Sequence, residues 1–320
     1  MSDTSARRPT ERDAALAVRA SLAVQARTIQ RFNTGNCHYV YDVLTEDGRR
    51  VVARLANDET RDVLAGGVYW HQRLRGVGAP IPALLASDLT SARDFPYMLL
   101  ERLPGDDLGA VYDTLTRAER HTLAAEIVAL QRSVARLPRA SGFGFARSYD
   151  DPTLRSSWLD VVTADLERSR QRIAAAGVVS PRHIERVGER IMTIGDYLRA
   201  IEPTPFLDDT TTKNVIVWQG RLSGVVDTDV VCFGDPLFTL ALTRVALLAH
   251  RLDVDYADHW QALLTLDGVR ERALTVYVAL FLVGFMSELG QRFNRAQPEP
   301  IDETYLRHLE RLLDEALAAG

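Results

Sequence analysis

Hydrophobic and polar positions alternate along the first part of the chain and then take up a helical spacing. Alternation in "HYVYDV" and "RRVVARLA", on either side of the Asp-Gly pair of "TEDG", predicts a β-hairpin. Apolar residues at helical spacing predict an amphipathic helix over residues 11–30 and a second helix over 58–76 that begins at an Asp58 cap. The segments "APIPALLASD" and "DFPYMLLERL" are expected to be extended. Residues 1–103 are therefore expected to form a small β-rich unit with a leading helix.

From residue 104 to 320 the pattern is mostly helical and contains one β-hairpin. Helices are expected near residues 117–136, 154–176, 181–201, 237–251, 256–265, 268–292 and 302–318. The hairpin is formed by "NVIVW" and "RLSGVVD", which flank the two-residue turn Gln219-Gly220. The pattern thus predicts an α+β architecture, with a small β-rich lobe joined to a large helical lobe that carries one hairpin. Ligands of such proteins usually bind between the lobes.

The composition is that of a globular protein and argues against several functional classes. The chain has 320 residues, of which 46% are hydrophobic and 25% charged, and its net charge is −5. Because a nucleic-acid-binding protein needs a basic face, we expect no nucleic-acid partner. No segment reaches the roughly 18–20 apolar residues that span a bilayer, and the N-terminus has no apolar signal region. We therefore expect a cytoplasmic protein that does not bind membranes and is a monomer or a homodimer.

Acidic side chains gather at the two ends of the predicted hairpin in the helical lobe. Asp208 and Asp209 precede it in "LDDTTTKNVIV", and Asp227 and Asp229 follow it. Because a hairpin returns the chain on itself, we expect Asp227 to lie beside Asp209 and Asn214. Clustered carboxylates raise one another's pKa unless a cation lies between them. Carboxylate and amide oxygens suit Mg²⁺, which typically takes one or two carboxylates together with phosphate oxygens.

The spacing of these residues carries a resemblance to known proteins. Asp209, four residues, Asn214, and then Asp227 after a hairpin resembles the catalytic loop and metal-binding aspartate of protein kinases. The continuation "RLSGVVDTDVVCFGDPLFTLA" resembles the aminoglycoside phosphotransferase and choline kinase-like family, as do "TGNCHYVYDV", "VVARL" and "PYMLLERLPGDDL" upstream. In that family these segments correspond to the first hairpin loop, the phosphate-contacting strand and the hinge. The resemblance covers residues 25–245 and implies a two-lobed protein kinase-like fold.

Carried over to this sequence, the resemblance implies a role for each of these residues. Asp209 would accept the proton of a substrate hydroxyl, and Asn214 and Asp227 would hold Mg²⁺ against the nucleotide phosphates. Arg54 would contact those phosphates in place of the family's strand cation, since a guanidinium can bind phosphate oxygens through two N–H groups. Lys213 is the only lysine among 38 Lys and Arg residues, and we expect its ammonium to face the transferred γ-phosphate.

The remaining nucleotide contacts are expected on the β-rich lobe. Backbone groups between Glu101 and Leu103 would meet the adenine. Gly35 and Asn36 would cover the phosphates, where a missing side chain lets the backbone approach.

Three positions depart from the family pattern. Leu207 stands where the family usually has a loop-bracing histidine, a role that leucine could fill by packing. The helix glutamate that pairs with the strand cation should fall near Gly67, and the nearest alternatives are Glu59 and Glu101. Thr239 replaces the acid that usually follows Gly-Asp-Pro.

The implied activity is transfer of the γ-phosphate of ATP or GTP to a hydroxyl of a small molecule, such as an aminoglycoside-like antibiotic, an amino alcohol or a sugar. Asp208 and Asp229 are candidate substrate contacts, although Asp208 could equally cap the loop, and Asp229 could be a metal ligand or a solvated loop residue. One alternative is a catalytically inactive nucleotide-binding module with the kinase fold. Another is a haloacid dehalogenase-like phosphatase, because "VVDTDVV" fits its signature with Asp227 as nucleophile and Asp229 as acid.

Overall fold

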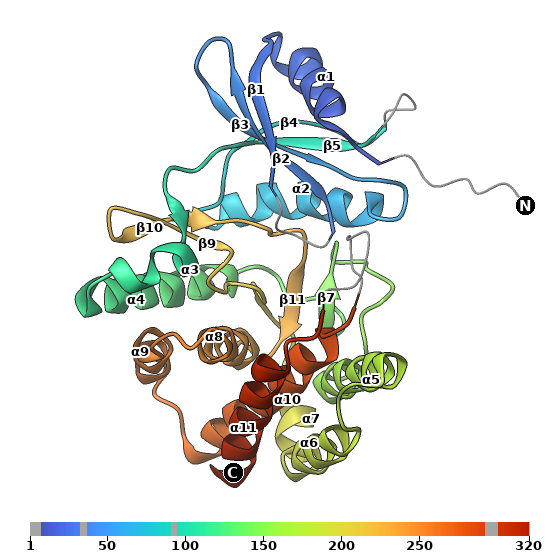
Figure 1. The fold of residues 1–320 in the computed structure, drawn as a ribbon, viewed down its shortest axis with the longest axis vertical. Helices are drawn as coiled ribbons and strands as arrows, with labels where there is room; N and C mark the ends of the chain where they lie inside the picture. The colour runs from blue at the N-terminus through green and yellow to red at the C-terminus, as the bar shows by residue number, and fades with distance from the viewer. Residues whose placement is uncertain (1–7, 33–36, 91–94, 292–299, 320) are drawn as a thin grey trace, which may run out of the picture.

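The computed structural model describes residues 8–32, 37–90, 95–291 and 300–319 and contains a β-rich lobe above a helical lobe (Figure 1). The β-rich lobe is built on an antiparallel five-stranded sheet with the order β1-β2-β3-β5-β4. Its strands are β1 (Ala26–Arg31), β2 (Tyr39–Thr45), β3 (Arg50–Leu55), β4 (Leu84–Asp88) and β5 (Tyr97–Glu101). The expected α+β architecture of two lobes is confirmed.

The first helix is shorter than its sequence pattern predicts. Helix α1 covers Glu11–Leu22 and ends at Ala23, whose φ of 54° is left-handed. The rest of the segment expected to be helical forms β1, which pairs with β2 at the edge of the sheet. Because an edge strand is buried on little of its surface, β1 carries no clear alternation, and the prediction of a helix over 11–30 was wrong for its second half.

Helix α2 (Arg61–Gly76) lies between the sheet and the helical lobe (Figure 1). It begins three residues after the expected Asp58, with Thr60 as its N-cap. Trp70 and Leu74 of α2 are fully buried within the core of the helical lobe, and the Trp70 indole N–H donates to the Ala146 carbonyl at 2.6 Å. This helix therefore joins the two lobes through a shared core.

The helical lobe is arranged around the long apolar helix α10 (Figure 1), which packs against α5, α6, α8 and α11. The helix expected over 268–292 corresponds to α10, which ends at Glu288. The helices of this lobe are α3 (Leu108–Val111), α4 (Arg117–Val134), α5 (Trp158–Ala176), α6 (Arg182–Thr193), α7 (Gly195–Ala200), α8 (Leu237–Ala249), α9 (Asp255–Leu264), α10 (Gly268–Glu288) and α11 (Glu303–Ala319). The single helix expected over 181–201 is divided at Ile194. None of the helices in the described ranges is both long and apolar enough to cross a membrane.

Two three-stranded sheets hold the segments between the helices in place. One has the order β10-β9-β6 and contains the predicted hairpin, β9 (Val215–Trp218) and β10 (Arg221–Val225). Its turn residues Gln219 and Gly220 have φ values of 50° and 74°, as a two-residue hairpin turn requires. The other sheet has the order β7-β11-β8, and the sequence pattern did not predict it. The strands that complete these sheets are β6 (Asp106–Asp107), β7 (Gly144–Ala146), β8 (Thr204–Phe206) and β11 (Val231–Gly234).

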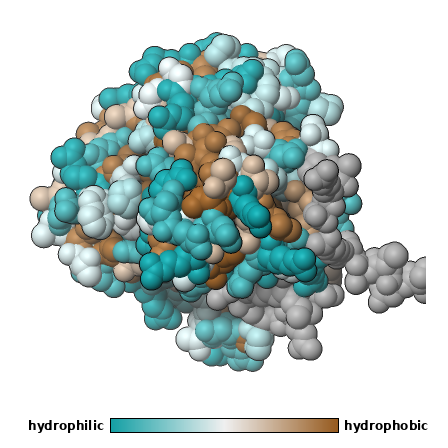
Figure 2. All heavy atoms as spheres, turned by 90° about the horizontal axis from the view of Figure 1, so that it is seen from above, coloured by the Kyte–Doolittle hydropathy of each residue, from teal (hydrophilic) through white to brown (hydrophobic). Residues whose placement is uncertain are grey.

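The outer face of the β-rich lobe, which points away from the helical lobe, has hydrophobic surface near its middle and hydrophilic residues around it (Figure 2). Leu16 of α1 and Leu85 of β4 are the large exposed hydrophobic side chains in the described part of this lobe.

Candidate active site

The loop between β8 and β9 brings the predicted catalytic residues to the junction of the lobes. Strand β8 runs antiparallel to β11, with Phe206 opposite Cys232. Because β8 ends where β11 begins, the segment after β8, which carries Asp208 and Asp209, runs beside the segment before β11, and the charge of Asp209 raises the pKa of Asp227. The short β8–β11 pairing therefore sets the distance between the two acidic segments.

The catalytic loop is held by an amide side chain from α4. The Leu207 N–H donates to Oε1 of Gln131 at 3.0 Å, and Gln131 Nε2 donates to the Leu207 carbonyl at 2.8 Å and to Oγ1 of Thr210 at 3.2 Å. Leu207 is itself 3% exposed and belongs to the main core. The loop thus has two braces where the family uses a histidine: the packed Leu207 side chain that we expected, and the Gln131 amide, which sequence reasoning missed.

A buried group of threonines anchors the next turn of the loop. The hydroxyls of Thr210 and Thr239 are 2.9 Å apart, and Thr243 Oγ1 donates to the Thr210 carbonyl at 3.4 Å. All three side chains are completely buried. Thr239, which replaces an acid of the family pattern, therefore fastens the loop through neutral hydroxyl contacts.

Asp209 is an exposed carboxylate with a fixed orientation. Its Oδ1 accepts a hydrogen bond from Thr211 Oγ1 at 2.7 Å, and its carbonyl accepts one from Asn214 Nδ2 at 3.1 Å. Because the Asn214 nitrogen is used in this way, its amide oxygen is left to act as a ligand. An exposed carboxylate on a braced loop is suited to accept a proton from a bound hydroxyl.

The hairpin returns Asp227 to the side of Asn214. Val215 pairs with Val225, and the Val226 N–H donates to the Asn214 carbonyl at 2.9 Å, so Asp227 is the next residue beyond the ladder. Asp227 has a left-handed φ of 62°, an unusual backbone conformation that often marks functional positions. Desolvation at the junction of the lobes raises its pKa, although Arg54 opposes this and 52% of the side chain is exposed.

The donor set fits a magnesium ion that is shared with nucleotide phosphates. Asp227 would supply a carboxylate oxygen and Asn214 the amide oxygen. No group of three or more His, Cys, Asp or Glu side chains within the described ranges is arranged to hold a metal ion. Mg²⁺ bound through phosphates needs only one or two protein carboxylates.

Arg54 of β3 lies between the two hairpin acids. Its Nη1 and Nη2 donate to Oδ1 and Oδ2 of Asp229 at 2.8 and 2.6 Å, and Nη2 also donates to Oδ1 of Asp227 at 2.7 Å. Burial works against the guanidinium charge, but the two carboxylates outweigh it and raise the pKa of Arg54. Neither Glu59 nor Glu101 is a partner of Arg54: Glu59 is exposed, and the Glu101 carboxylate accepts the Ala83 N–H at 3.2 Å.

His38 completes a buried group with Arg54 and the two acids. Its Nδ1 lies 3.3 Å from Asp229 Oδ2 and 3.0 Å from Arg54 Nη2. Because both Nη2 hydrogens are directed at carboxylates, we assign the Nδ1 hydrogen to His38, which donates it to Asp229. Burial lowers the pKa of His38, but its hydrogen bond to Asp229 outweighs this effect and raises the pKa to about 9. Two cations thus balance two carboxylates in this group.

The pairing with Arg54 excludes one of the alternatives for Asp229. The side chain is 8% exposed, and although burial raises its pKa, Arg54 and His38 lower it below the usual value. The expectation of a solvated loop residue was therefore wrong.

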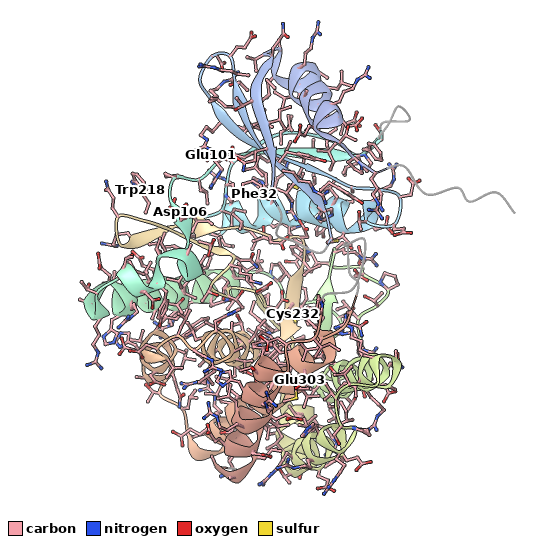
Figure 3. All side chains as sticks on the ribbon, viewed as in Figure 1. Phe32, Glu101, Asp106, Trp218, Cys232 and Glu303 are labelled. Carbon is pink, nitrogen blue, oxygen red and sulfur yellow. The ribbon has the colours of Figure 1, made fainter. Side chains whose placement is uncertain are left out.

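The hinge presents one backbone donor at the expected nucleotide position. Figure 3 places Glu101, the last residue of β5, and Asp106, the first of β6, at the junction of the lobes. The Glu101 N–H donates to the Ala83 carbonyl at 2.9 Å, and the Leu103 carbonyl accepts from Arg102 Nη1 at 3.0 Å. Among the described residues, none accepts from the Leu103 N–H, so this donor of the hinge is not used within the described part of the chain. Gly35 and Asn36 lie outside the described residues.

Lys213 is exposed on the side of the loop that faces the ends of α8 and α10. Burial lowers the pKa of His250, which follows α8, and the charge of Lys213 lowers it further. Burial raises the pKa of Glu288, the last residue of α10, while Arg172 and Lys213 oppose that change. No residue in the described ranges forms an ion pair or a hydrogen bond with the Lys213 ammonium.

Two other acids have contrasting surroundings. Asp208 is partly buried, and burial together with the charge of Asp209 raises its pKa to about 7. Asp235 accepts hydrogen bonds from the Leu237 N–H at 3.0 Å and from the hydroxyls of Tyr197 and Tyr277 at 2.7 and 2.9 Å. Asp235 therefore accepts the backbone N–H of the first residue of α8.

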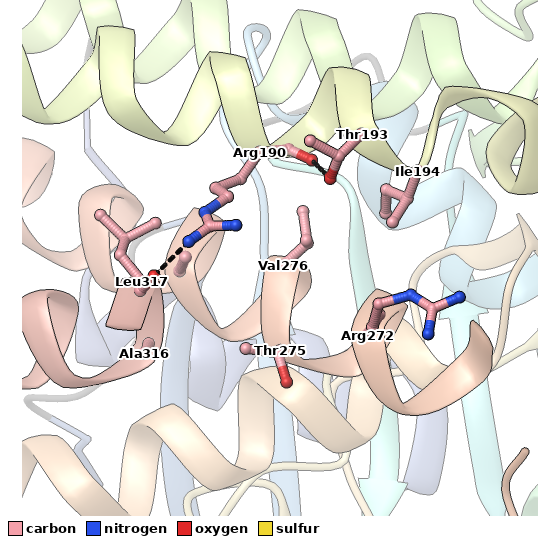
Figure 4. A pocket seen from close by; sticks show the side chains of 9 residues that line it. Arg190, Thr193, Ile194, Arg272, Thr275, Val276, Ala316 and Leu317 are labelled. Carbon is pink, nitrogen blue, oxygen red and sulfur yellow. Dashed lines mark hydrogen bonds between the residues drawn. The ribbon is translucent and has the colours of Figure 1, made fainter. Parts of the chain in front are cut away.

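The cavity between α6, α10 and α11 is not a substrate site. It measures about 20 Å³, room for little more than one water molecule. Arg190 crosses it to donate to the Leu317 carbonyl, and Thr193 Oγ1 donates to the Arg190 carbonyl at 2.7 Å (Figure 4). A wider hollow of about 420 Å³ beside Gln261 and Glu271 lies at the α9–α10 junction, away from the β-rich lobe (Figure 1).

Comparison with known proteins agrees with this geometry. The sequence model of the phosphotransferase enzyme family matches residues 28–274. A search of curated proteins found no match. Similar solved structures include a mutant of aminoglycoside 2'-phosphotransferase-IIIa in complex with GDP, with a TM-score of 0.69, 13% identity, and coverage of 97% of this chain and 98% of that one. A thermostable mutant of aminoglycoside phosphotransferase APH(4)-Ia, in a complex with ADP and hygromycin B, has a TM-score of 0.67, 15% identity, and coverage of 96% and 98%.

A protein described as a fructosamine-3-kinase from Thermobifida fusca also has this fold, with a TM-score of 0.60, 16% identity, and coverage of 96% of this chain and 98% of that one. The protein kinase-like fold that the sequence implies is thus confirmed, and its antiparallel sheets are incompatible with the parallel sheet that a haloacid dehalogenase-like phosphatase requires. With more than half of its length matched, this chain belongs to the phosphotransferase enzyme family.

Proposed function

We propose that this protein transfers the γ-phosphate of ATP or GTP to a hydroxyl of a small molecule. The observation that carries the proposal is the convergence of Asp209, Asn214 and Asp227 at one end of a hairpin, opposite Arg54. Phosphoryl transfer requires mainly positioning and neutralisation of charge, and these residues supply both.

In this proposal each residue has a defined task. Asp209 accepts the proton of the acceptor hydroxyl as its oxygen bonds to the γ-phosphorus and the bond from phosphorus to the β-phosphate oxygen breaks. Asn214 and Asp227 hold Mg²⁺, which neutralises charge on the phosphates when it is bound. Arg54 binds phosphate oxygens, and Lys213 faces the γ-phosphate from the acceptor side of the loop. The Leu103 N–H donates to the purine.

The acceptor binds against the helical lobe, where Asp208, Asp209 and Glu288 supply negative charge. These acids favour a polyol or sugar that carries an amino group, which includes aminoglycoside-like antibiotics, amino alcohols and amino sugars. The neighbouring cations Lys213 and Arg172 argue against a purely cationic ligand. The similarity to proteins described as aminoglycoside phosphotransferases and a fructosamine-3-kinase supports this range of acceptors.

The alternative of an inactive nucleotide-binding module rests on the lost histidine and helix glutamate. Gln131 and Asp229 make contacts at both positions, so the two losses do not by themselves argue against catalysis.

The test is a thermal-shift screen with Mg-ATP and Mg-GTP, followed by a phosphotransfer assay over a panel of hydroxyl compounds. We expect turnover with at least one acceptor and its loss in Asp209→Asn. Asp196→Asn, at a fully exposed position on α7, is the control and should keep wild-type activity. Nucleotide binding without turnover across the whole panel would favour the inactive module.

A further inference from the structure

Arg54 is paired from an unexpected direction. In protein kinases the strand cation is held by a glutamate from the neighbouring helix. Here Gly66 and Gly67 lie where the corresponding helix, α2, comes closest to Asp229. The carboxylate that holds Arg54 comes instead from the segment between β10 and β11. Asp229 meets both Nη atoms of Arg54, although the two residues are 175 positions apart.

The two glycines of α2 leave the space that Asp229 occupies. A Cβ atom on Gly67 would lie 2.4 Å from Oδ1 of Asp229, and one on Gly66 would lie 2.6 Å from the Asp229 carbonyl oxygen. Real Cβ atoms do not approach oxygen so closely, so any side chain at Gly67 would displace the carboxylate. The glycine pair and Asp229 therefore form one arrangement, in which the carboxylate lies where a glutamate from the helix would reach.

Asp229 and Asp227 hold Arg54 in different ways. Asp229 binds the guanidinium through both oxygens and is 8% exposed, whereas Asp227 binds through one oxygen and is 52% exposed. A two-point contact out of water is the more persistent of the two. Asp227 can thus turn to a metal ion while Asp229 keeps the guanidinium in place.

We propose that Asp229 is the positioning residue for Arg54 and takes the place of the helix glutamate in this chain. It holds the guanidinium towards the nucleotide phosphates and leaves Asp227 available as a metal ligand. Helix α2 is anchored to the helical lobe through Trp70. Its glycines therefore keep a fixed position beside Asp229, which belongs to the same lobe. The inference rests on the proposed function, since it assigns Arg54 to a nucleotide.

The first test compares ligands with and without phosphates. Isothermal titration calorimetry should show that Asp229→Asn weakens binding of Mg-AMP-PNP by about tenfold or more, since a charge-assisted two-point contact is lost. Binding of adenosine, which has no phosphate for Arg54 to meet, should stay within about twofold of the wild type, well below the factor expected for a lost charged contact. A merely structural role for Asp229 would weaken both ligands together.

The second test uses the space between Gly67 and Asp229. Gly67→Ala should weaken Mg-AMP-PNP binding in the wild type but add little to Asp229→Ala, in which the clashing oxygen is absent. Gly76→Ala is the matched control, because a Cβ there would meet nothing within 4 Å. Gly67→Glu combined with Asp229→Ala should recover part of the affinity by restoring a carboxylate from the helix. The comparison of Gly67→Ala, Asp229→Ala and their combination also tests the positioning role of Asp229 if Asp229→Asn does not fold.

The outcomes separate the inference from the function on which it rests. Equal loss of adenosine and Mg-AMP-PNP, or independent effects of Gly67→Ala and Asp229→Ala, would overturn the positioning role while leaving the phosphotransferase proposal intact. Failure of the wild-type protein to bind any nucleotide would overturn both.

Discussion

Replacing Gln131 by methionine tests whether the amide clamp holds the catalytic loop. Methionine has a similar length but cannot donate or accept in this geometry, so the substitution removes three hydrogen bonds of 2.8, 3.0 and 3.2 Å. Gln131 is 8% exposed and Leu207 3%, so water cannot easily replace the lost partner. The N–H and carbonyl of Leu207 would each remain buried and unpaired.

The size of the effect follows from these two orphaned groups. A buried polar group without a partner costs about 1–3 kcal/mol, so we expect Gln131→Met, which leaves two such groups, to lower the free energy of unfolding by about 2–6 kcal/mol. Urea unfolding followed by circular dichroism measures this loss. Because Asp209 follows Leu207 on the same loop, kcat should fall more than the KM for ATP changes.

The matched control is Gln171→Met, the same chemical change at an exposed position on α5. Its free energy of unfolding should differ from that of the wild type by less than about 0.5 kcal/mol. If Gln131→Met were as stable and as active as this control, the clamp would not brace the loop and the reasoning would be refuted.

Three further substitutions probe the hinge, the loop and the acceptor side. Gly105→Ala should lose at least about 2 kcal/mol of stability, because Gly105 has a φ of +99° and a Cβ there would lie 2.0 Å from the Val217 carbonyl oxygen. Gly48→Ala, with a φ of +85° and no neighbour within 4 Å, should lose only the stability that backbone strain costs. Equal losses of the two variants in urea unfolding would contradict the role of the clash. The pKa of Asp208 is raised to about 7, so the folded protein holds a proton between about pH 4 and 7 that the unfolded chain has released, and this group lowers stability as the pH rises through that window. Asp208→Asn should therefore gain stability relative to the wild type from pH 4 to pH 8 in a series of thermal melts, and a constant difference would argue against the raised pKa. Lys213→Met should lower kcat by about 10²-fold and change the KM for ATP little, with Lys213→Arg less affected; an unchanged kcat would exclude contact with the γ-phosphate.

Several parts of the fold were predictable because their signals are local. The β9–β10 hairpin has a two-residue turn between short apolar strands, and α10 has an apolar run too long for a strand. The same hairpin implies that Asp227 returns beside Asn214, because antiparallel pairing is a property of adjacent segments. The order of the motifs along the chain was also enough to identify the family.

Other parts depended on contacts that no local pattern encodes. Strand β1 is an exposed edge strand, and β8 and β11 have three and four residues, too few to show a period of two. Each forms because a partner strand elsewhere in the chain satisfies its backbone groups. The β8–β11 pairing nevertheless brings the segment with Asp208 and Asp209 beside the segment with Asp227.

By itself, the sequence predicted which residues would carry the chemistry: a base, two metal ligands and a strand cation, at spacings set by one loop and one hairpin. Only the tertiary structure decided what holds them. Gln131 reaches Leu207 across 76 residues, and Asp229 reaches Arg54 across 175. The physical reason is that a buried amide or carboxylate takes its role from the groups that surround it in space, and those groups are brought together only when the chain folds.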